Sequence, residues 1–190
     1  MRTSGGSYFS DKTNTIVMTA MMMCLVLVTT YTFKIPTPFQ GYVHLGDAMI
    51  FLSVLIVGKK YGAVAAAFGS ALADLLGGYV AFAPFVIKGL MAVVMGLFID
   101  AMVRRKKNRI KIAGVPLIEI IGMIVAGLVM VLGYGVADAA LAGNLMTGIL
   151  SMPANCGQFA AGVIIASILA AALYKTPAKK YFTYRLDEVA

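Results

Sequence analysis

The chain has 190 residues, of which 61% are hydrophobic and 13% are charged, and its 16 Lys and Arg outnumber its 8 Asp and Glu to give a net charge of +8. A soluble domain is about 45–50% apolar and about 25% charged, so this composition excludes an ordinary cytosolic enzyme, a disordered tail and a secreted disulfide scaffold. At about 20 residues per membrane-crossing helix, the chain holds roughly six or seven crossings and no separate soluble domain. The sequence predicts an integral membrane protein.

Apolar runs separated by turn and charge signals predict six membrane helices. Residues 1–14 are too polar for a signal peptide, so the first apolar run is expected to remain as a span. The runs lack the alternation of a membrane β-barrel, so we predict one all-α membrane domain over residues 1–190. In chain order, the expected segments are spans at 15–33, 48–57, 61–76, 84–103, 112–136 and 153–174, a mixed loop at 138–152, and a basic cytoplasmic tail at 175–190.

The second span, residues 48–57, is too short to cross about 30 Å of hydrocarbon unaided. We expect it either to be extended by residues 45–47 or to pack inside the bundle.

The basic residues predict an orientation. With the N-terminus in the cytoplasm, the outer half keeps only Lys34 and Lys88. This asymmetry predicts six spans with both termini cytoplasmic and makes a nucleic-acid role unnecessary, since no aromatic interleaving or binding module accompanies the charge. The other fourteen Lys and Arg lie inside: Arg2, Lys12, Lys59, Lys60, Arg104, Arg105, Lys106, Lys107, Arg109, Lys111, Lys175, Lys179, Lys180 and Arg185.

Motifs for catalysis and cofactor binding are missing from the sequence. It contains no P-loop, HExxH, GxSxG or CxxC pattern, and its single histidine, His44, cannot form a two-histidine metal site within one chain. Cys24 and Cys156 lie in apolar stretches and are expected to be free thiols. We therefore expect no enzyme activity, no metal site and no cofactor.

Four ionisable groups are expected at membrane depth, where such groups are functional candidates. Asp74, Lys88 and Asp138 are predicted toward the outside, and Glu119 toward the inside with a structural role. Two readings stay open for Asp74 and Lys88: an ion pair across the turn between the third and fourth spans, or direct contact with a ligand.

Aromatic and neutral polar side chains gather on the predicted outer face. Their chemistry suits a small flat polar heterocycle, which needs stacking faces and a few hydrogen bonds. Alternatively, the rings form an interfacial belt, His44 is a loop histidine satisfied within the protein, and Asp47 is the N-cap of the second span, the reading preferred for Asp47. The candidate ligand-binding residues are Gln40, Tyr42, His44, Asp74, Tyr79, Phe82, Lys88, Tyr134, Asn155 and Gln158.

The first span carries a pair of small residues, Ala20 and Cys24, among four methionines. Small residues four apart let another helix approach closely, and methionine gives an adaptable surface. Such a face can bind a partner or simply pack inside the bundle.

Three segments resemble the substrate-binding S components of energy-coupling factor (ECF) vitamin transporters. They are PTPFQGYVHLGDAMIFL (36–52), GSALADLLGGY (69–79) and APFVIKGLMAVVMG (83–96), and the resemblance covers residues 15–174. It is closest to the branch with riboflavin-type, pyridoxine-type and hydroxymethylpyrimidine-type members.

The resemblance implies a six-helix S-component bundle in the cell membrane that binds one vitamin near its outer face, with residues 34–47 as a lid. It also implies a transmembrane T component and two cytoplasmic ATPases, which together form an ECF-type ABC importer, and delivery by tilting of the loaded subunit. The family's AxxxA docking pattern corresponds to Ala20 and Cys24, where the cysteine departs from the pattern but stays small.

The few cations on the outer face disfavour anionic folate or thiamine pyrophosphate. Pyridoxine or hydroxymethylpyrimidine is favoured and riboflavin comes next. The alternative function is a stand-alone secondary carrier or channel driven by an ion gradient.

Overall fold

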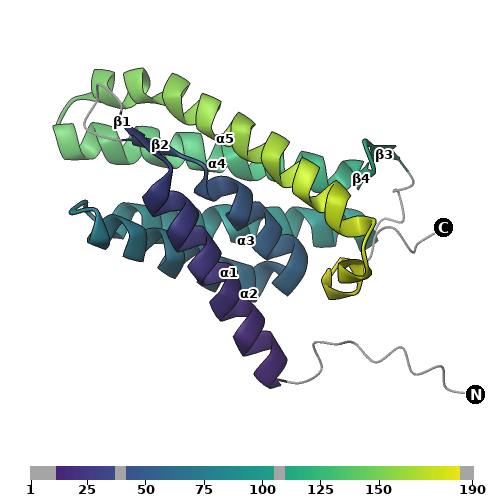
Figure 1. Ribbon diagram of the computed structural model, residues 1–190. Coiled ribbons are helices and arrows are strands. Elements are labelled where there is room, and N and C mark those ends of the chain that lie inside the picture. Colours follow the sequence, from purple (N-terminus) through teal and green to yellow (C-terminus); the bar gives the residue numbers. More distant parts are fainter. Residues whose placement is uncertain (1–11, 37–41, 105–109, 185–190) are drawn as a thin grey trace, which may run out of the picture.

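Long helices make up most of the computed structural model, which describes residues 12–36, 42–104 and 110–184 (Figure 1). Five helices are long and apolar enough to cross a membrane, which confirms the predicted all-α membrane class. The elements in chain order are α1 (Lys12–Thr32), β1 (Lys34–Pro36), β2 (Tyr42–His44), α2 (Gly46–Leu76), α3 (Phe82–Arg104), β3 (Lys111–Ile112), β4 (Val115–Pro116), α4 (Leu117–Ala142), α5 (Leu145–Tyr174) and the 3-10 helix η1 (Pro177–Tyr181).

Helix α2 folds back on itself at Gly58. This glycine has φ 78° and ψ 173°, a conformation that essentially only glycine adopts. The Ser53 Oγ lies 3.4 Å from the Gly62 carbonyl oxygen, although nine residues of straight helix would separate them by about 13 Å. A Cβ at Gly62 would lie 2.9 Å from the Cα of Val54. The two packed arms of α2 correspond to the two spans predicted on either side of Gly58.

The first arm of α2 is the centre of the hydrophobic core. Ile50, Phe51, Val54 and Leu55 are completely buried in a cluster that includes residues of α1, α3, α4 and α5. A helix that is apolar on all sides is stable only when it is surrounded. The segment predicted as a short second span therefore lies in an arm that begins at Gly46 and packs inside the bundle.

The chain after α5 packs on the end of this arm. The turn at Gly58 deprives nearby carbonyls of their helical partners. Thr183 replaces them: its N–H donates to the Leu55 carbonyl at 2.8 Å and its hydroxyl to the Ile56 carbonyl at 2.7 Å. The Phe182 and Tyr174 rings pack beside this contact with centroids 4.3 Å apart.

The loop predicted at 138–152 is wrong. Gly143 takes the left-handed conformation (φ 61°) that ends α4, and Asn144 caps α5 by accepting a hydrogen bond from the Met146 N–H at 2.9 Å. Glycine and asparagine are favoured at these positions, so both helices extend into the expected loop. Pro153, expected to begin the last span, lies inside α5.

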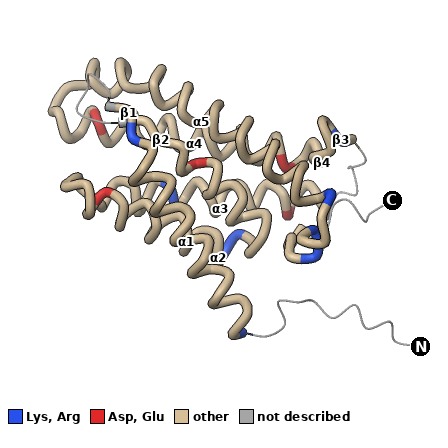
Figure 2. Tube along the Cα trace, viewed as in Figure 1, with Lys and Arg blue, Asp and Glu red and all other residues tan. Residues whose placement is uncertain are grey.

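The expected start of the fifth span at residue 112 is also wrong. Residues Lys111–Ile112 and Val115–Pro116 pair as the hairpin β3–β4, and Ala113 and Gly114 turn with φ 52° and 88°. Positive φ at both turn positions matches the twist of a two-residue hairpin. Together with η1, this hairpin lies at the end of the molecule where many of the basic residues gather (Figure 2).

Candidate functional site

A cavity of about 360 Å³ lies at the other end of the bundle, where α1, α2 and α4 end and α3 and α5 begin. It combines aromatic rings, hydroxyls, amides and two carboxylates, and none of its described lining residues is a Lys or Arg. The lining residues are Thr30, Val43, His44, Ser70, Asp74, Tyr79, Val80, Ala83, Pro84, Tyr134, Asp138, Leu141, Ser151, Ala154, Asn155 and Gln158.

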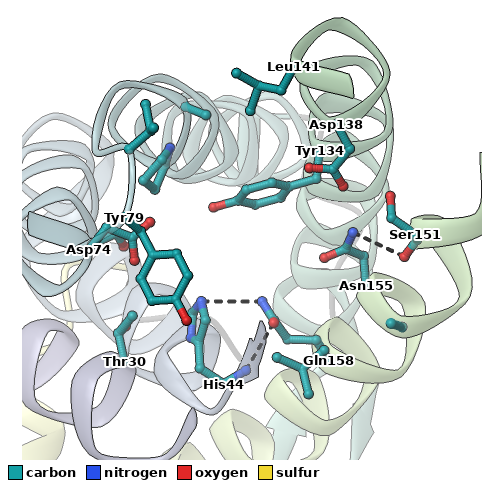
Figure 3. A pocket seen from close by; sticks show the side chains of 16 residues that line it. Thr30, His44, Asp74, Tyr79, Tyr134, Asp138, Leu141, Ser151, Asn155 and Gln158 are labelled. Atoms are coloured by element: carbon teal, nitrogen blue, oxygen red, sulfur yellow. Dashed lines mark hydrogen bonds between the residues drawn. The ribbon is translucent and has the colours of Figure 1, made fainter. Parts of the chain in front are cut away.

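Two walls face each other across this cavity (Figure 3). Thr30, Asp74 and Tyr79 lie on one side, and Tyr134 and Asn155 lie on the other. A ligand between the walls would thus meet polar groups from helices far apart in the sequence. Six of the predicted ligand-binding residues line the cavity: His44, Asp74, Tyr79, Tyr134, Asn155 and Gln158.

A buried ion pair lies behind the lining. The Lys88 Nζ is 2.5 Å from the Asp47 Oδ1, and both side chains are completely buried. The expected pair of Asp74 with Lys88 is therefore wrong, and so is the N-cap role for Asp47, since Leu45 is the N-cap of α2 and no side chain caps it. Lys88 does not line the cavity itself, but its Nζ lies 5.1 Å from the centroid of the Tyr134 ring in the wall.

Gln158 connects the ion pair to the cavity. Its Nε2 donates to the Asp47 Oδ2 at 2.8 Å, while its Oε1 accepts from the His44 backbone N–H at 3.0 Å. One amide thus holds β2 against α5 and satisfies the second oxygen of the buried carboxylate. Because both the amide oxygen and the amide nitrogen of Gln158 have protein partners, this side chain has a fixed orientation when a ligand arrives.

His44 is a buried, neutral imidazole, whose Nε2 lies 3.5 Å from the Gln158 Nε2. Its Nδ1 accepts from the Gly46 N–H at 3.0 Å, so in the neutral ring the proton is on Nε2. Burial, reinforced by the charge of Lys88, lowers the His44 pKa from 6.5 to about 3. The ring at the base of the cavity therefore stays uncharged at physiological pH.

Lys34 is placed at the edge of the site between aromatic rings. Its Nζ lies 5.2 Å from the Tyr31 ring centroid and 4.9 Å from that of Tyr79, and it donates to the Ala73 carbonyl at 3.4 Å. Partial burial lowers the Lys34 pKa, and the nearby Asp74 opposes that shift. Lys34 thereby joins the β1–β2 hairpin to the end of α2 and to a ring that lines the cavity.

Phe82, in contrast, is a predicted residue that lies away from the cavity. The Phe82 ring is 76% exposed and does not line the cavity, because it is the first residue of α3 and faces outward. Gln40 lies outside the described residues, as does the side chain of Tyr42 in β2. Asp138, predicted on the outer side, does line the cavity.

Sequence reasoning did not select Thr30, Ser70 and Ser151 as site residues, although all three line the cavity. Small hydroxyl side chains are common in membrane helices, so their type alone gives no signal. Ser70 had one available signal: it precedes Asp74 by four residues and therefore shares its helix face.

Ala20 and Cys24 are both exposed on α1. The buried face of that helix is formed instead by Thr15, Thr19, Met22, Val26 and Thr30. Internal bundle packing is therefore wrong as the explanation of the small pair, which lies on the outside of the bundle.

Elsewhere, Glu119 is completely buried near the opposite end and accepts a hydrogen bond from the Tyr174 hydroxyl at 2.6 Å. Its predicted structural role is consistent with this contact.

The polar cavity at one end of this bundle of apolar helices is a candidate small-molecule site. The family model described as "ECF-type riboflavin transporter, S component" matches residues 10–175. The chain therefore belongs to this family and is a membrane-embedded transporter subunit of the vitamin-binding class.

Two individual proteins are similar to the chain. A Pyrococcus woesei protein, described as an uncharacterized protein of the gap 3′ region, is 40% identical over 112 residues, which are 57% of this chain and 68% of that protein. A solved structure of the S component of a bacterial ECF transporter matches with a TM-score of 0.66 and 18% identity, over 87% of this chain and 98% of that one. At this identity, the second match supports the fold alone.

Proposed function

We propose that the chain is the substrate-binding subunit of an ECF-type importer and that its cavity binds one neutral heteroaromatic B vitamin. The observation that carries the proposal is the cavity, in which aromatic rings and neutral amides surround a space of about 360 Å³. Rings supply stacking faces and amides supply oriented donors and acceptors, which together select a flat polar heterocycle.

The charges of the lining favour the vitamin over its phosphate ester. Asp74 and Asp138 are the charged groups among the described lining residues, and the buried Lys88 is already paired with Asp47. A phosphate placed there would face two carboxylates without an unpaired cation in the lining. Flavin mononucleotide and pyridoxal phosphate are thus expected to bind more weakly than the free vitamins.

The size of the cavity favours a tricyclic flavin over a single pyridine or pyrimidine ring. At about 360 Å³, it has roughly the volume of twelve liquid water molecules, more than one substituted six-membered ring fills. The riboflavin description of the matching family supports the same order. Riboflavin is the first candidate here, followed by pyridoxine and hydroxymethylpyrimidine.

The direct test is calorimetric titration of the purified full chain with riboflavin, pyridoxine and hydroxymethylpyrimidine and with the corresponding phosphate esters. We expect nanomolar binding of one free vitamin and at least tenfold weaker binding of its ester. Native mass spectrometry of the same preparation would identify a vitamin that co-purifies. Binding of none of these compounds would overturn the proposal.

Transport is expected to need partners, a T component that docks on α1 and two ATPases. Uptake into cells should therefore require co-expression of all of them. Uptake by this chain alone, driven by an ion gradient, would establish the secondary-carrier alternative.

We further propose that both arms of α2 act as membrane passes, which gives six in all, with cytoplasmic termini and the cavity on the outside. The basic residues at the end opposite the cavity support this orientation (Figure 2). Thiol-reactive labelling of single cysteines at Leu141, near the cavity, and at Lys179, in η1, tests it. An impermeant reagent added to whole cells should label only the former.

A further inference from the structure

We propose that Thr30 and Ser70 bind the alcoholic hydroxyl groups of the substrate. This assignment rests on the function proposed above and names the part of the vitamin that one wall of the cavity recognises. Both side chains are 1% exposed and both line the cavity. Within the described part of the chain, the Thr30 Oγ1 and the Ser70 Oγ have no hydrogen-bond partner.

Other helix hydroxyls in this protein do find partners. In α1, the Thr29 hydroxyl donates to the Leu25 carbonyl at 2.7 Å, and in α2 the Ser53 hydroxyl donates to the Ile50 carbonyl at 2.7 Å. Such bonds to the preceding turn are the usual solution for serine and threonine in apolar helices. Thr30, directly after Thr29, makes no such bond to the preceding turn. Burying a hydroxyl without a hydrogen bond is unfavourable.

The packing of α1 on the second arm of α2 aligns these groups. A Cβ at Gly69 would lie 2.9 Å from the Cβ of Val26, so the two helices touch closely at this level. Thr30 lies one turn beyond Val26, Ser70 follows Gly69, and Asp74 lies one turn beyond Ser70. Three oxygen-bearing side chains therefore line the seam between the two helices as it approaches the open end.

Gly46 provides room for the Thr30 hydroxyl next to His44. A Cβ at Gly46 would collide with the Thr30 Oγ1 and would lie 2.8 Å from the His44 Nδ1. The glycine thus lets a hydroxyl and an imidazole converge at the base of this wall.

This set of groups suits alcohols better than carbonyl or phosphate oxygens. A serine or threonine hydroxyl both donates and accepts, and its hydrogen rotates to fit its partner. A carboxylate such as that of Asp74 accepts hydrogen bonds, and an alcohol can donate one to it whereas a carbonyl oxygen cannot. The ribityl chain of riboflavin and the hydroxymethyl groups of pyridoxine both supply such alcohols.

The opposite wall of the cavity is suited to the aromatic ring of the substrate. The Tyr134 ring faces the cavity with the Lys88 ammonium 5.1 Å from its centroid, and the Asn155 amide is oriented by a 3.2 Å bond to the Ser151 carbonyl (Figure 3). The substrate would therefore lie with its ring against α4 and α5 and its hydroxyls against α1 and α2.

The test compares probes that differ in their hydroxyl groups. Affinities of the full chain are measured for riboflavin against lumichrome, which lacks the ribityl chain, and for pyridoxine against 4-deoxypyridoxine. Thr30→Val and Ser70→Ala should each weaken binding of the hydroxyl-bearing probe roughly three- to tenfold. They should change the affinity for lumichrome by less than about twofold, and the loss for 4-deoxypyridoxine, which keeps one hydroxymethyl group, should be smaller than the loss for pyridoxine.

The unfolding temperature of the ligand-free variants distinguishes a binding role of the two hydroxyls from a structural role. Because neither hydroxyl has a protein partner, Thr30→Val and Ser70→Ala should leave the unfolding temperature of the ligand-free protein unchanged or raised. The controls Thr29→Val and Ser53→Ala remove bonded hydroxyls that do not line the cavity and should leave both affinities unchanged.

The outcomes that overturn the assignment are distinct. Unchanged affinity for the hydroxyl-bearing probe in both variants, or an equal loss for both probes of a pair, would overturn it while leaving the proposed function standing. Failure of the wild-type chain to bind any of the four probes or hydroxymethylpyrimidine would overturn the proposed function and this assignment with it.

Discussion

The surroundings of His44 hold its imidazole in the neutral form. Burial, together with the charges of Lys88 and Lys34 and against the opposing charge of Asp47, lowers its pKa from 6.5 to about 3. Between these two pH values the unfolded chain binds a proton that the folded chain does not, so stability rises with pH there. The contribution of His44 to the free energy of unfolding is complete above about pH 6.5 and is lost as the pH falls toward 3.

We therefore expect His44 to add a slope of up to about 1.4 kcal/mol per pH unit to the free energy of unfolding between pH 6.5 and 4.5. His44→Gln removes the titrating ring and should flatten the profile. Unfolding of wild type and variant in detergent, followed over this pH range, measures the difference. Parallel profiles would contradict the assignment of a neutral buried ring.

The pair of Asp47 and Lys88 should show strong energetic coupling. Removing one member leaves the other buried without its partner, which costs about 3–5 kcal/mol. Asp47→Asn and Lys88→Met should each lower the unfolding temperature markedly, while the double variant should regain part of the loss. Thermal unfolding of the three variants gives the coupling energy, and strictly additive losses would show that the two charges do not interact.

At this scale, the sequence predicts which residues are polar at membrane depth but not which of them meet. Lys88 had three acids near the same membrane face, Asp47, Asp74 and Asp138. Which acid pairs with Lys88 depends on how α3 is rotated against the two arms of α2, and hydropathy gives no information about that rotation. The unbonded state of Thr30 and Ser70 is likewise a property of side-chain packing.

Among the elements, α2 depends most on a single residue. Gly58 has φ 78° and ψ 173°, and a Cβ there would lie 3.3 Å from the Thr183 Cγ2. Gly58→Ala should therefore destabilise the protein by about 1–3 kcal/mol. Gly157→Ala is the matched control, because Gly157 lies within α5 with nothing within 4 Å of its added Cβ.

The control Gly157→Ala should leave the free energy of unfolding unchanged or raise it by up to about 1 kcal/mol, because alanine is a better helix former than glycine. Unfolding temperatures of the two variants are compared under one condition. Equal effects would show that the backbone at Gly58 is not constrained.

Helix positions were predictable where charge or glycine interrupts an apolar run, as at Gly58 with Lys59 and Lys60. The predicted boundary between α4 and α5 was wrong, because Asp138, Asn144 and Pro153 weaken the hydropathy signal there. Gly143 and Asn144 nevertheless are residues that favour helix ends. Capping preferences locate this turn better than hydropathy does.

For the whole molecule, the two ends differ in charge. The cavity end carries few charges, several of them paired or buried, whereas many basic residues gather at the end with η1 and β3–β4 (Figure 2). Exposing charged groups to lipid is costly, so the cavity end is the easier end to rotate into the bilayer. Under the tilting delivery that the family resemblance implies, a partner would hold the subunit while it rotates.

The exposed small pair on α1 is the surface we expect that partner to bind. Ala20 and Cys24 both face outward, and a large ring at either position would prevent another helix from approaching closely. Ala20→Trp should abolish vitamin uptake in cells that express the T component and ATPases. It should leave vitamin affinity of the purified chain within about twofold of wild type, because Ala20 does not line the cavity.

Ile168→Trp is the matched control, since Ile168 is 63% exposed on α5. It adds the same ring to another apolar surface and should retain both binding and uptake. Normal uptake by Ala20→Trp would place the docking surface elsewhere on the bundle, and equal loss in both variants would mean that any added ring impairs transport. Loss of uptake in Ala20→Trp alone, with binding retained, separates coupling on α1 from recognition in the cavity.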